Sequence, residues 1–345
     1  MNKVQPNQRL SNMETARIVA MAMILIGHFI LYSSLWNGSD FISHQDVSEP
    51  VPAIIFILFY SICVVGVNIF VLISGYFTIH LTWKSFLSYY LLCIFYNGAS
   101  FLIDVFLLDG FSTKALLKVF LVDKTVNWFF RAYFWLMLLS PLLNKALEHL
   151  SLKELRIIVA LLFFLNCISG FIFQEFNTNG YNVYNFIFLY VLGNWISKDF
   201  RSKLFSGGKS LAVYLLFCLL NALVAVLILF KSEYSLRHVF AYNNPLIILA
   251  SVGLLVFFTR LHFSNKFINV FASTVVAALF IQQVYFKLQP VIHVTNTLLT
   301  SVLLITPLLF ILAFAIEFPR KQVATFIISR VLSMFQNQSF LKSSK

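Results

Sequence analysis

The feature that most constrains this chain is a series of apolar runs, each long enough to cross a lipid bilayer as one helix. Such a helix needs about 20 mainly apolar residues, because the hydrocarbon layer of a membrane is about 30 Å thick. Ten segments meet or approach this length, and polar, turn-forming stretches such as NGSD, NTNG, SGGK and YNNP lie between them. The predicted spans cover residues 13–35, 53–79, 86–108, 128–148, 155–174, 182–197, 210–230, 242–261, 268–288 and 295–317.

The composition excludes a soluble globular fold. Hydrophobic residues make up 60% of the 345 positions and charged residues only 11%, whereas soluble domains carry about 25% charged residues. We therefore predict an all-α, polytopic integral membrane protein with about ten transmembrane helices and no second, soluble domain. Residues 1–318 form the expected transmembrane domain. Residues 319–345 mix basic and apolar side chains and form a basic cytoplasmic tail or an interfacial helix.

Lysine and arginine lie mostly on one side of the predicted spans. If the N-terminus is cytoplasmic, the inside segments hold 17 of these residues and the outside segments six, not counting Arg17 and Arg131 at helix ends. The positive-inside rule then predicts that both termini are cytoplasmic, which an even number of spans also requires. The net charge of +12 belongs mainly to this face, where membrane lipids rather than nucleic acid are the expected partners.

The first predicted span contains two ionisable residues in the stretch RIVAMAMILIGH, which begins at Arg17 and ends at His28. Eleven residues of helix separate them by about 16 Å along the axis, and their directions differ by only about 20°. Both side chains therefore lie on one face of the helix. Ionisable groups are costly in hydrocarbon and indicate a functional site by default. The alternative is a structural role, with Arg17 paired to Glu14 or lipid headgroups and His28 packed between helices.

Three further stretches complete a pattern: GVNIFVLISGYF at 66–77, NWFFRAYFWLMLLSPLLN at 127–144, and YNNPLIILASVGLLVFF at 242–258. With the Arg-x10-His spacing, they make the chain resemble the membrane acyltransferases of the acyltransferase-3 family. The resemblance implies a bundle of ten core helices in a bacterial cell membrane. It also implies transfer of an acyl group, most commonly acetyl, from cytoplasmic acyl-CoA to a hydroxyl of an extracytoplasmic glycan or another envelope acceptor. Acyl-CoA is then a co-substrate, and no permanently bound cofactor is expected.

The resemblance assigns functional positions only where the motifs match. The matching residues are Arg17, His28, Ser74, Gly75, Trp128 and Phe129. The chain departs from the pattern at two positions where relatives often carry histidine. These are Asn127, before the Trp-Phe pair, and Gln282, in the stretch LFIQQ. The second departure raises the question whether the acceptor side works in the usual way.

The matched residues supply the groups that acyl transfer needs. A histidine can take the acceptor's proton near neutral pH or carry the acyl group itself, so His28 is the predicted catalytic residue. The planar guanidinium suits phosphate, so Arg17 at the cytoplasmic mouth is the predicted anchor for the phosphates of CoA. Lys84 follows the second predicted span on the same side and is a further candidate for these phosphates.

The remaining candidates each keep two interpretations. Ser74 and Gly75 allow close approach of a substrate or of a neighbouring backbone, while Trp128 and Phe129 line the acceptor path or form part of an interfacial aromatic belt. Arg131 faces a cavity or anchors its helix at the interface. No metal site is expected, because the other histidines lack metal-ligand spacing. The four cysteines fall within apolar runs, where a disulfide is not expected.

The predicted function is therefore that of a membrane-bound, acyl-CoA-dependent O-acyltransferase acting on a glycan or a lipid-linked sugar. Two alternatives stay open. Buried charges would also serve a secondary transporter or flippase, although the two halves lack matching Gly/Pro-interrupted segments. A catalytically silent relative with a sensing or scaffold role is the second alternative, and Gln282 is the residue that raises it.

Overall fold

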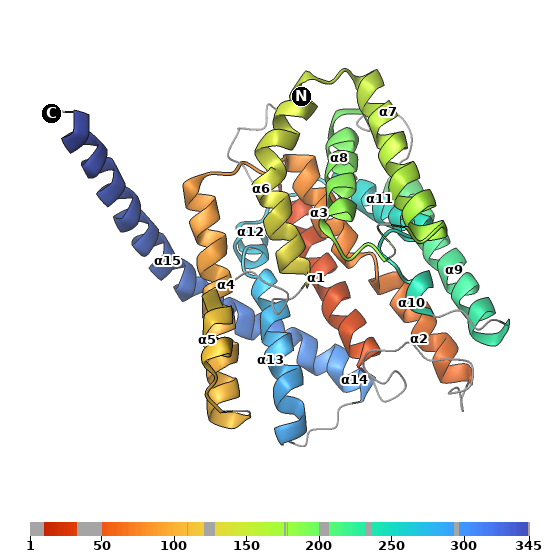
Figure 1. The fold of residues 1–345 in the computed structure, drawn as a ribbon. Helices are drawn as coiled ribbons and strands as arrows, with labels where there is room; N and C mark the ends of the chain where they lie inside the picture. Colours follow the sequence, from red (N-terminus) through yellow and green to blue (C-terminus); the bar gives the residue numbers. More distant parts are fainter. Residues whose placement is uncertain are drawn as a thin grey trace.

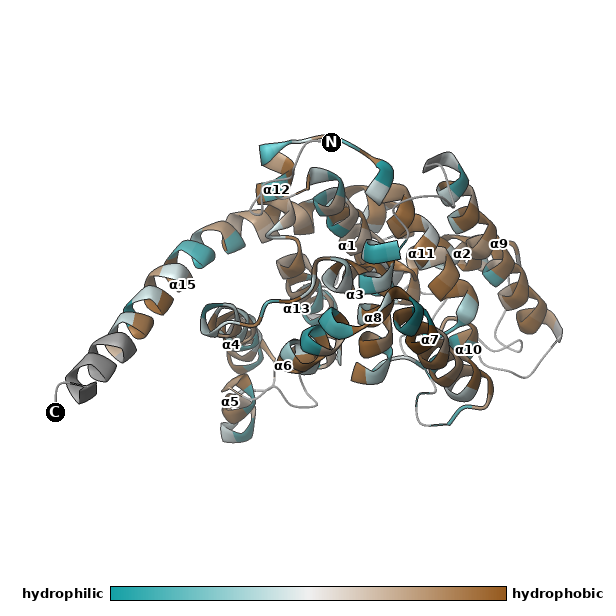
Figure 2. Ribbon diagram, turned by 90° about the horizontal axis from the view of Figure 1, so that it is seen from above, coloured by the Kyte–Doolittle hydropathy of each residue, from teal (hydrophilic) through white to brown (hydrophobic). Residues whose placement is uncertain are grey.

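The computed structural model of the chain describes residues 10–32, 50–108, 110–120, 128–175, 177, 179–199, 207–231, 236–292 and 297–343. All regular secondary structure in these ranges is helical, which confirms the all-α prediction (Figure 1). Helices suit a membrane because each satisfies its backbone hydrogen bonds within its own segment. The hydropathy colouring in Figure 2 shows that most of these helices are predominantly apolar.

Each of the ten predicted segments is occupied by helix. In chain order the elements are α1 (Ser11–Leu31), α2 (Pro50–Cys63), α3 (Gly66–Phe77), α4 (Trp83–Leu107), α5 (Thr113–Phe120), α6 (Trp128–His149), α7 (Leu152–Phe163), the π-helix η2 (Phe164–Ile172), α8 (Val183–Asp199), α9 (Gly207–Lys231), α10 (Leu236–Val239), α11 (Pro245–Arg260), α12 (Lys266–Ala272), α13 (Val276–Ile292), α14 (Leu298–Thr300), the π-helix η3 (Ser301–Ile305) and α15 (Thr306–Ser343).

Within the described residues, six helical segments are long and apolar enough to cross a membrane, and the bent pair α12–α13 raises this number to seven. The six are Ser11–Leu31, Val51–Phe77, Trp83–Leu107, Leu152–Ile172, Gly208–Phe230 and Leu298–Met334. α11 is apolar but only 16 residues long, which is short for an upright span. The count of ten spans and the cytoplasmic position of both termini stay predictions.

Glycines allow α3 and α8 to pack with their backbones in direct contact at the centre of the bundle. A Cβ atom at Gly75 would lie 2.0 Å from the carbonyl oxygen of Tyr190, and one at Gly193 would lie 2.2 Å from that of Leu72. Small residues are the usual means of such close approach between membrane helices. Of the two roles considered for Gly75, the structure gives it contact with a neighbouring backbone.

The last helix, α15, crosses residue 318, the boundary that the sequence suggested between the transmembrane domain and the basic tail. α15 continues through Pro319 as one helix of 38 residues, about 57 Å long at 1.5 Å per residue. Its C-terminal half extends away from the other helices in both views (Figures 1 and 2). Residues 319–343 are therefore helical, and their position at a membrane interface stays a prediction.

Candidate active site

A cavity of about 470 Å³, which we call the basic cavity, lies among the helices near the N-terminal half of α1. Its walls come from α1, α3, α4, α6, α12, α13 and α15, and they include three of the predicted site residues, Arg17, Ser74 and Phe129. The charged residues that line it are Glu14, Arg17, Glu317, Arg320 and Lys321. Three cations thus face two carboxylates, and the cavity carries an excess of positive charge.

Arg17 pairs with Glu14 and also lines the basic cavity. Its Nη1 donates to Oε1 of Glu14 at 2.6 Å, which is the predicted structural pair. Glu14 is only 4% exposed, whereas the Arg17 side chain is 29% exposed and lines the basic cavity. A guanidinium has five N–H donors, so the pair with Glu14 leaves donors for a bound anion.

Arg320 and Lys321 also line the basic cavity, although the sequence placed them in the basic tail. Nε and Nη2 of Arg320 donate to the two carboxylate oxygens of Glu317 at 2.7 and 2.6 Å, and the Tyr96 hydroxyl donates to the same carboxylate at 3.1 Å. Lys321 donates to the carbonyl oxygen of Ser273. The stretch EFPRK held a signal for this site, because a carboxylate at the end of an apolar span needs a buried cationic partner.

A break between α12 and α13 places a helix N-terminus at the same cavity. The two helices meet at an angle of 46°, and Ala272, Ser273 and Val276 on either side of the break line the cavity. The backbone N–H groups of Ala277 and Ala278 in the first turn of α13 donate to the carbonyl oxygens of Thr274 and Val275. This helix end therefore offers mainly the positive end of the helix dipole, which favours anionic ligands. Together with Arg17, Arg320 and Lys321, this end of α13 makes the cavity suited to a polyanionic group.

His28 lies farther along α1, where its imidazole is held by a fully buried amide. Nδ1 of His28 lies 2.8 Å from Oε1 of Gln282, and Nε2 of Gln282 donates to the carbonyl oxygen of Leu25 at 2.8 Å. Because the Gln282 nitrogen donates to a carbonyl, its oxygen faces His28 and accepts a hydrogen bond from Nδ1–H of the imidazole. The neutral imidazole then has its lone pair on Nε2, which is the form that a proton acceptor needs.

α13 connects the two parts of the site. Val276 in its first turn lines the basic cavity, and Gln282 follows six residues later, about 9 Å along the helix. Between them Phe280 stacks on Phe130 with ring centroids 3.9 Å apart, and Phe130 itself lines the cavity. His28 does not line the cavity, and Phe280 and Gln282, two residues apart on α13, point to different faces of that helix.

The comparison with protein families decides the identity of this arrangement. The family model of the acyltransferase domain of the acyltransferase-3 family matches residues 10–335. The chain belongs to the acyltransferase-3 family. No curated protein and no solved structure matches it. Family membership makes the chain a membrane acyltransferase by class, and the matched range includes both α1 and the helices that carry Gln282, Arg320 and Lys321.

In this acyltransferase, the Ser-Gly and Trp-Phe motifs are each split between two environments. Ser74 lines the basic cavity, where its hydroxyl donates to the Phe70 carbonyl at 3.0 Å and lies 3.1 Å from the Tyr133 hydroxyl. Gly75, the next residue, packs against α8. Phe129 lines the cavity, whereas Trp128 packs on Tyr181 and Tyr242 at ring-centroid distances of 4.6 and 5.3 Å.

Like His28, Gly75 and Trp128, two further predicted residues lie outside the basic cavity. Lys84 is exposed at the start of α4, and Arg131 is half-buried on α6, but neither lines the cavity. Asn127, the first of the two departures from the family pattern, lies outside the described residues, as do His44 and His293. The described part of the chain holds no cluster of three His, Cys, Asp or Glu side chains that could bind a metal ion. All four cysteines are buried.

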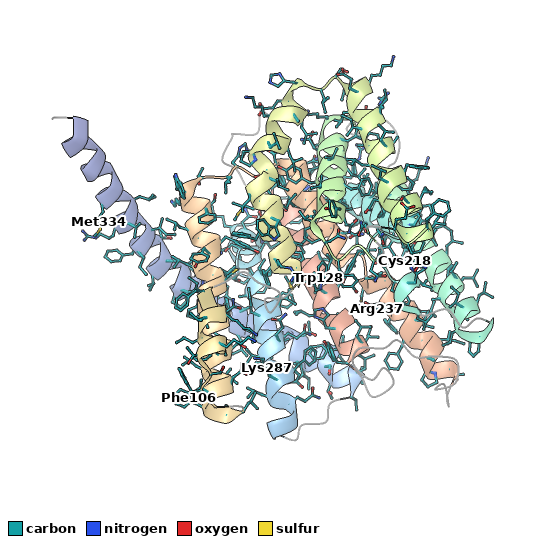
Figure 3. All side chains as sticks on the ribbon, viewed as in Figure 1. Phe106, Trp128, Cys218, Arg237, Lys287 and Met334 are labelled. Carbon is teal, nitrogen blue, oxygen red and sulfur yellow. The ribbon has the colours of Figure 1, made fainter. Side chains whose placement is uncertain are left out.

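A network of buried asparagines near Trp128 was not predicted from the sequence. Nδ2 of Asn166, in η2, donates to Oδ1 of Asn185 at 2.9 Å, and Nδ2 of Asn243 donates to the carbonyl oxygen of Asn166 at 3.1 Å. These bonds tie η2, α8 and the turn before α11 together beside Tyr242, which packs on Trp128. Figure 3 shows Trp128 near α1 at the end of α6 opposite the α6–α7 turn. Of these asparagines, only Asn243 belongs to a stretch that the sequence marked, YNNP, and that stretch indicated only a turn.

Proposed function

We propose that this membrane acyltransferase transfers an acyl group, in the simplest case acetyl, from acyl-CoA to a hydroxyl of an extracytoplasmic glycan, a lipid-linked sugar or another envelope acceptor, in a bacterial plasma membrane. The observation that carries the proposal is the coupling of the basic cavity to an oriented histidine through α1 and α13. A cavity with excess positive charge suits the phosphates of CoA. The oriented imidazole suits the proton transfer.

The donor's phosphates lie in the basic cavity in this proposal. Arg17, Arg320 and Lys321 provide the charge, and the N-terminus of α13 adds the positive end of its helix dipole. The pantetheine arm of CoA then spans the distance of about 16 Å along α1 between Arg17 and His28. His28 does not line the basic cavity, so side chains between the cavity and the imidazole must shift when the donor binds.

His28 acts through Nε2. It takes the proton of the acceptor hydroxyl, the alkoxide attacks the thioester carbonyl, and the departing thiolate of CoA takes the proton back as the ester forms. Gln282 accepts from Nδ1 throughout and stabilises the imidazolium that forms between the two transfers. If the acyl group is instead carried by the imidazole, it is also bonded to Nε2, because Nδ1 is hydrogen-bonded to Gln282. At position 282, where relatives often carry histidine, this chain thus has a glutamine that can support the same chemistry.

Two measurements test the function directly. The purified protein in detergent is mixed with acetyl-CoA, and free CoA is followed with a thiol reagent; ester-linked acetate is then measured in envelope fractions from cells with and without the protein. We expect slow release of CoA and a loss of envelope acetate without the protein. Acetyl-CoA that stays intact together with unchanged envelope acetate would favour a flippase or a silent relative instead.

The side of the membrane that the basic cavity faces has its own test. Lys145 near the end of α6 and Phe106 near the end of α4 are both exposed, and the native cysteines are buried. We expect an impermeant thiol reagent to label Phe106→Cys in intact cells and Lys145→Cys only after lysis. The reverse pattern would place Arg17 on the outer side and exclude the proposed route of the donor.

A further inference from the structure

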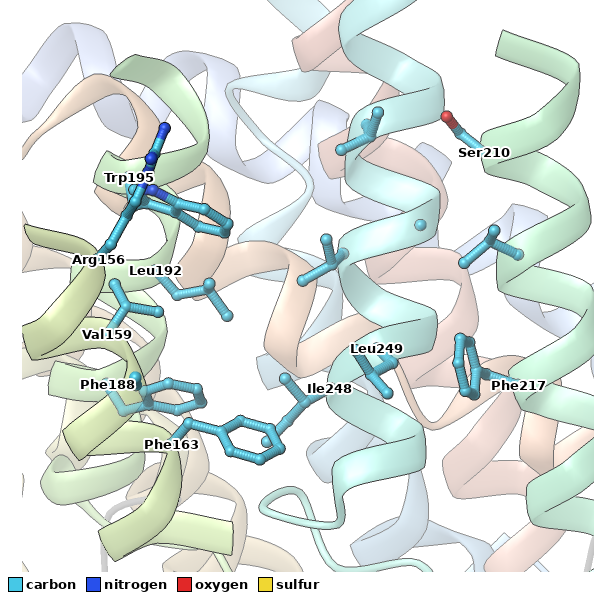
Figure 4. Close-up of a pocket in the computed structure, with 15 residues that line it drawn as sticks. Arg156, Val159, Phe163, Phe188, Leu192, Trp195, Ser210, Phe217, Ile248 and Leu249 are labelled. Atoms are coloured by element: carbon cyan, nitrogen blue, oxygen red, sulfur yellow. The ribbon is translucent and has the colours of Figure 1, made fainter. Parts of the chain in front are cut away.

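A second cavity, of about 560 Å³, lies outside the site described above and is not used by the proposed reaction. It is a groove between the helix pair α7–α8 and the helix pair α9–α11, and we call it the α7–α11 groove (Figure 4). Most of its lining is aliphatic or aromatic, including Val159, Phe163, Phe188, Phe217, Ile248 and Val252. Gly253 lets α9 and α11 pack closely along one wall, since a Cβ there would lie 2.9 Å from the backbone nitrogen of Tyr214.

The groove opens toward the surroundings of the bundle rather than toward its centre. Two of its walls belong to the candidate spans Leu152–Ile172 and Gly208–Phe230, of which only 22% and 33% is buried inside the molecule. In a membrane, an apolar groove on such helices is surrounded by hydrocarbon. A ligand that fills it must therefore present an apolar chain.

The polar side chains of the groove gather at one end. Figure 4 shows Arg156, Trp195 and Ser210 toward one end, and Phe163, Phe188 and Phe217 toward the other. The polar end adjoins the N-terminal turns of α7 and α9, on the side where the predicted topology places the cytoplasm. An arginine and an indole at the end of an apolar groove match the headgroup level of a phospholipid.

Charge at the polar end favours an anionic headgroup. Nε and Nη2 of Arg156 donate to the carboxylate of Asp199 at 2.6 and 2.8 Å, and the indole nitrogen of Trp195 donates to the same carboxylate at 3.0 Å. Asp199 thus fixes both side chains at the groove, and Nη1 of Arg156 is not used in these bonds. Lys153 and Lys209 lie nearby in sequence on α7 and α9, the latter next to Ser210.

The acidic residues of this end do not cancel its positive charge. Asp199 neutralises Arg156, and the carboxylate of Glu154, which caps α7 by accepting from the backbone nitrogen and hydroxyl of Ser151, offsets only one of the two lysines at 153 and 209. The charge of the other lysine remains beyond these pairs. Basic sites between membrane helices on the cytoplasmic side attract anionic lipid headgroups.

We propose that the α7–α11 groove binds one acyl chain of an anionic phospholipid, with the lipid phosphate beside Arg156 and Lys209. The chain lies along Phe163, Phe188 and Ile248, where it replaces bulk lipid contacts with a fitted apolar wall. The binding is independent of the acyl-transfer reaction, because the groove shares no lining residue with the basic cavity.

Trp195 provides the readout. The full-length protein in detergent is titrated with phosphatidylglycerol whose chains are brominated, and with phosphatidylcholine carrying the same chains, while tryptophan fluorescence is recorded. Bromine quenches an indole only at short range, so a chain in the groove quenches Trp195. We expect a saturable quenching that needs at least threefold less phosphatidylglycerol than phosphatidylcholine. In Trp195→Phe the saturable component should disappear.

Variants separate the chain site from the headgroup site. Val252→Phe fills the groove and should abolish saturable quenching by both lipids. Lys209→Gln and Arg156→Gln should raise the phosphatidylglycerol requirement to that of phosphatidylcholine, while Lys145→Gln, an exposed cation on α6, should change nothing. Equal requirements for the two lipids in the parent protein would overturn the preference for anionic lipid. Parent-like saturable quenching in folded Val252→Phe or in Trp195→Phe would show that the acyl chain does not bind in the groove. If Val252→Phe does not fold, the exposed lysine variants still test the preference for an anionic headgroup.

Discussion

The surroundings of Arg17 and His28, the two ionisable residues of α1 proposed to act in the reaction, are built in opposite ways. At one end, Arg17 shares the basic cavity with Arg320, Lys321 and a helix N-terminus, so several groups offer positive potential to one ligand. At the other end, the orientation of His28 depends on a single buried amide, Gln282. Binding of a polyanion tolerates the loss of one of several contacts, whereas proton transfer requires one nitrogen in one protonation state. We therefore expect that the loss of one cation near Arg17 is partly compensated by the others, whereas substitution of His28 or Gln282 is poorly tolerated.

The largest effect should come from His28→Ala. Removing the proposed base should lower turnover by about two to four orders of magnitude and leave donor affinity nearly unchanged. Turnover is measured as CoA release, and donor affinity by isothermal titration with acetyl-CoA. Size-exclusion chromatography checks that the bundle stays folded. If folded His28→Ala transfers acetyl at the parent rate, the histidine is a packing residue and the comparison between the two ends loses its basis.

The second-largest effect should come from Gln282→Leu, which removes both hydrogen bonds of the amide and puts an apolar side chain of similar size in its place. His28 Nδ1 and the Leu25 carbonyl lose their partner, which we expect to lower turnover roughly 10- to 100-fold with the donor KM unchanged. Gln282→His restores the residue type of relatives and should recover part of the rate.

A structural role alone makes a different prediction for the same pair of variants. If Gln282 only packs the bundle, Gln282→Leu should lower thermal stability and leave the turnover of the folded fraction unchanged. The imidazole tautomer provides a further readout, since nitrogen NMR of labelled His28 should show the proton on Nδ1 in the parent protein and a mixture of tautomers in Gln282→Leu.

Loss of one cation from the basic cavity should have a smaller effect, on binding rather than on turnover. We expect Arg17→Gln and Arg320→Gln each to raise the KM for acetyl-CoA by roughly 3- to 10-fold, because the remaining cations still hold the phosphates. Arg17→Lys should restore part of the affinity, since it keeps the charge but loses the planar fork. The double variant should lose more affinity than either single variant. A parent-like KM in the double variant would remove the CoA phosphates from this cavity.

The smallest effect is expected at Lys84. The sequence made this residue a candidate for the same phosphates, but it is exposed and does not line the basic cavity. Lys84→Gln should change the KM for acetyl-CoA by less than about twofold, as is usual for an exposed charge. A change as large as that of Arg17→Gln would mean that the donor extends beyond the cavity to the start of α4.

The sequence predicted the local features of this protein well, because they depend on neighbouring residues. Apolar length located the long helices but not the short helices α5 and α10, which lie between predicted spans. The period of 3.6 residues predicted that Arg17 and His28 share one face of α1. The family pattern of Arg17, His28 and the Ser-Gly and Trp-Phe motifs also lies in short stretches. The resemblance was confirmed by the match over residues 10–335, whereas the roles of these residues stay predictions.

Only the tertiary structure decided which faces meet. Gln282 looked like a loss of function in sequence but lies against His28, 254 positions away, and Arg320 and Lys321 looked like tail residues but line a cavity with Arg17. Ser74 and Gly75 belong to one motif, yet Ser74 faces the cavity and Gly75 packs against α8. Helical periodicity fixes the direction of each side chain on its own helix. The rotation of each helix toward its neighbours follows instead from packing of the whole bundle, which no local pattern records.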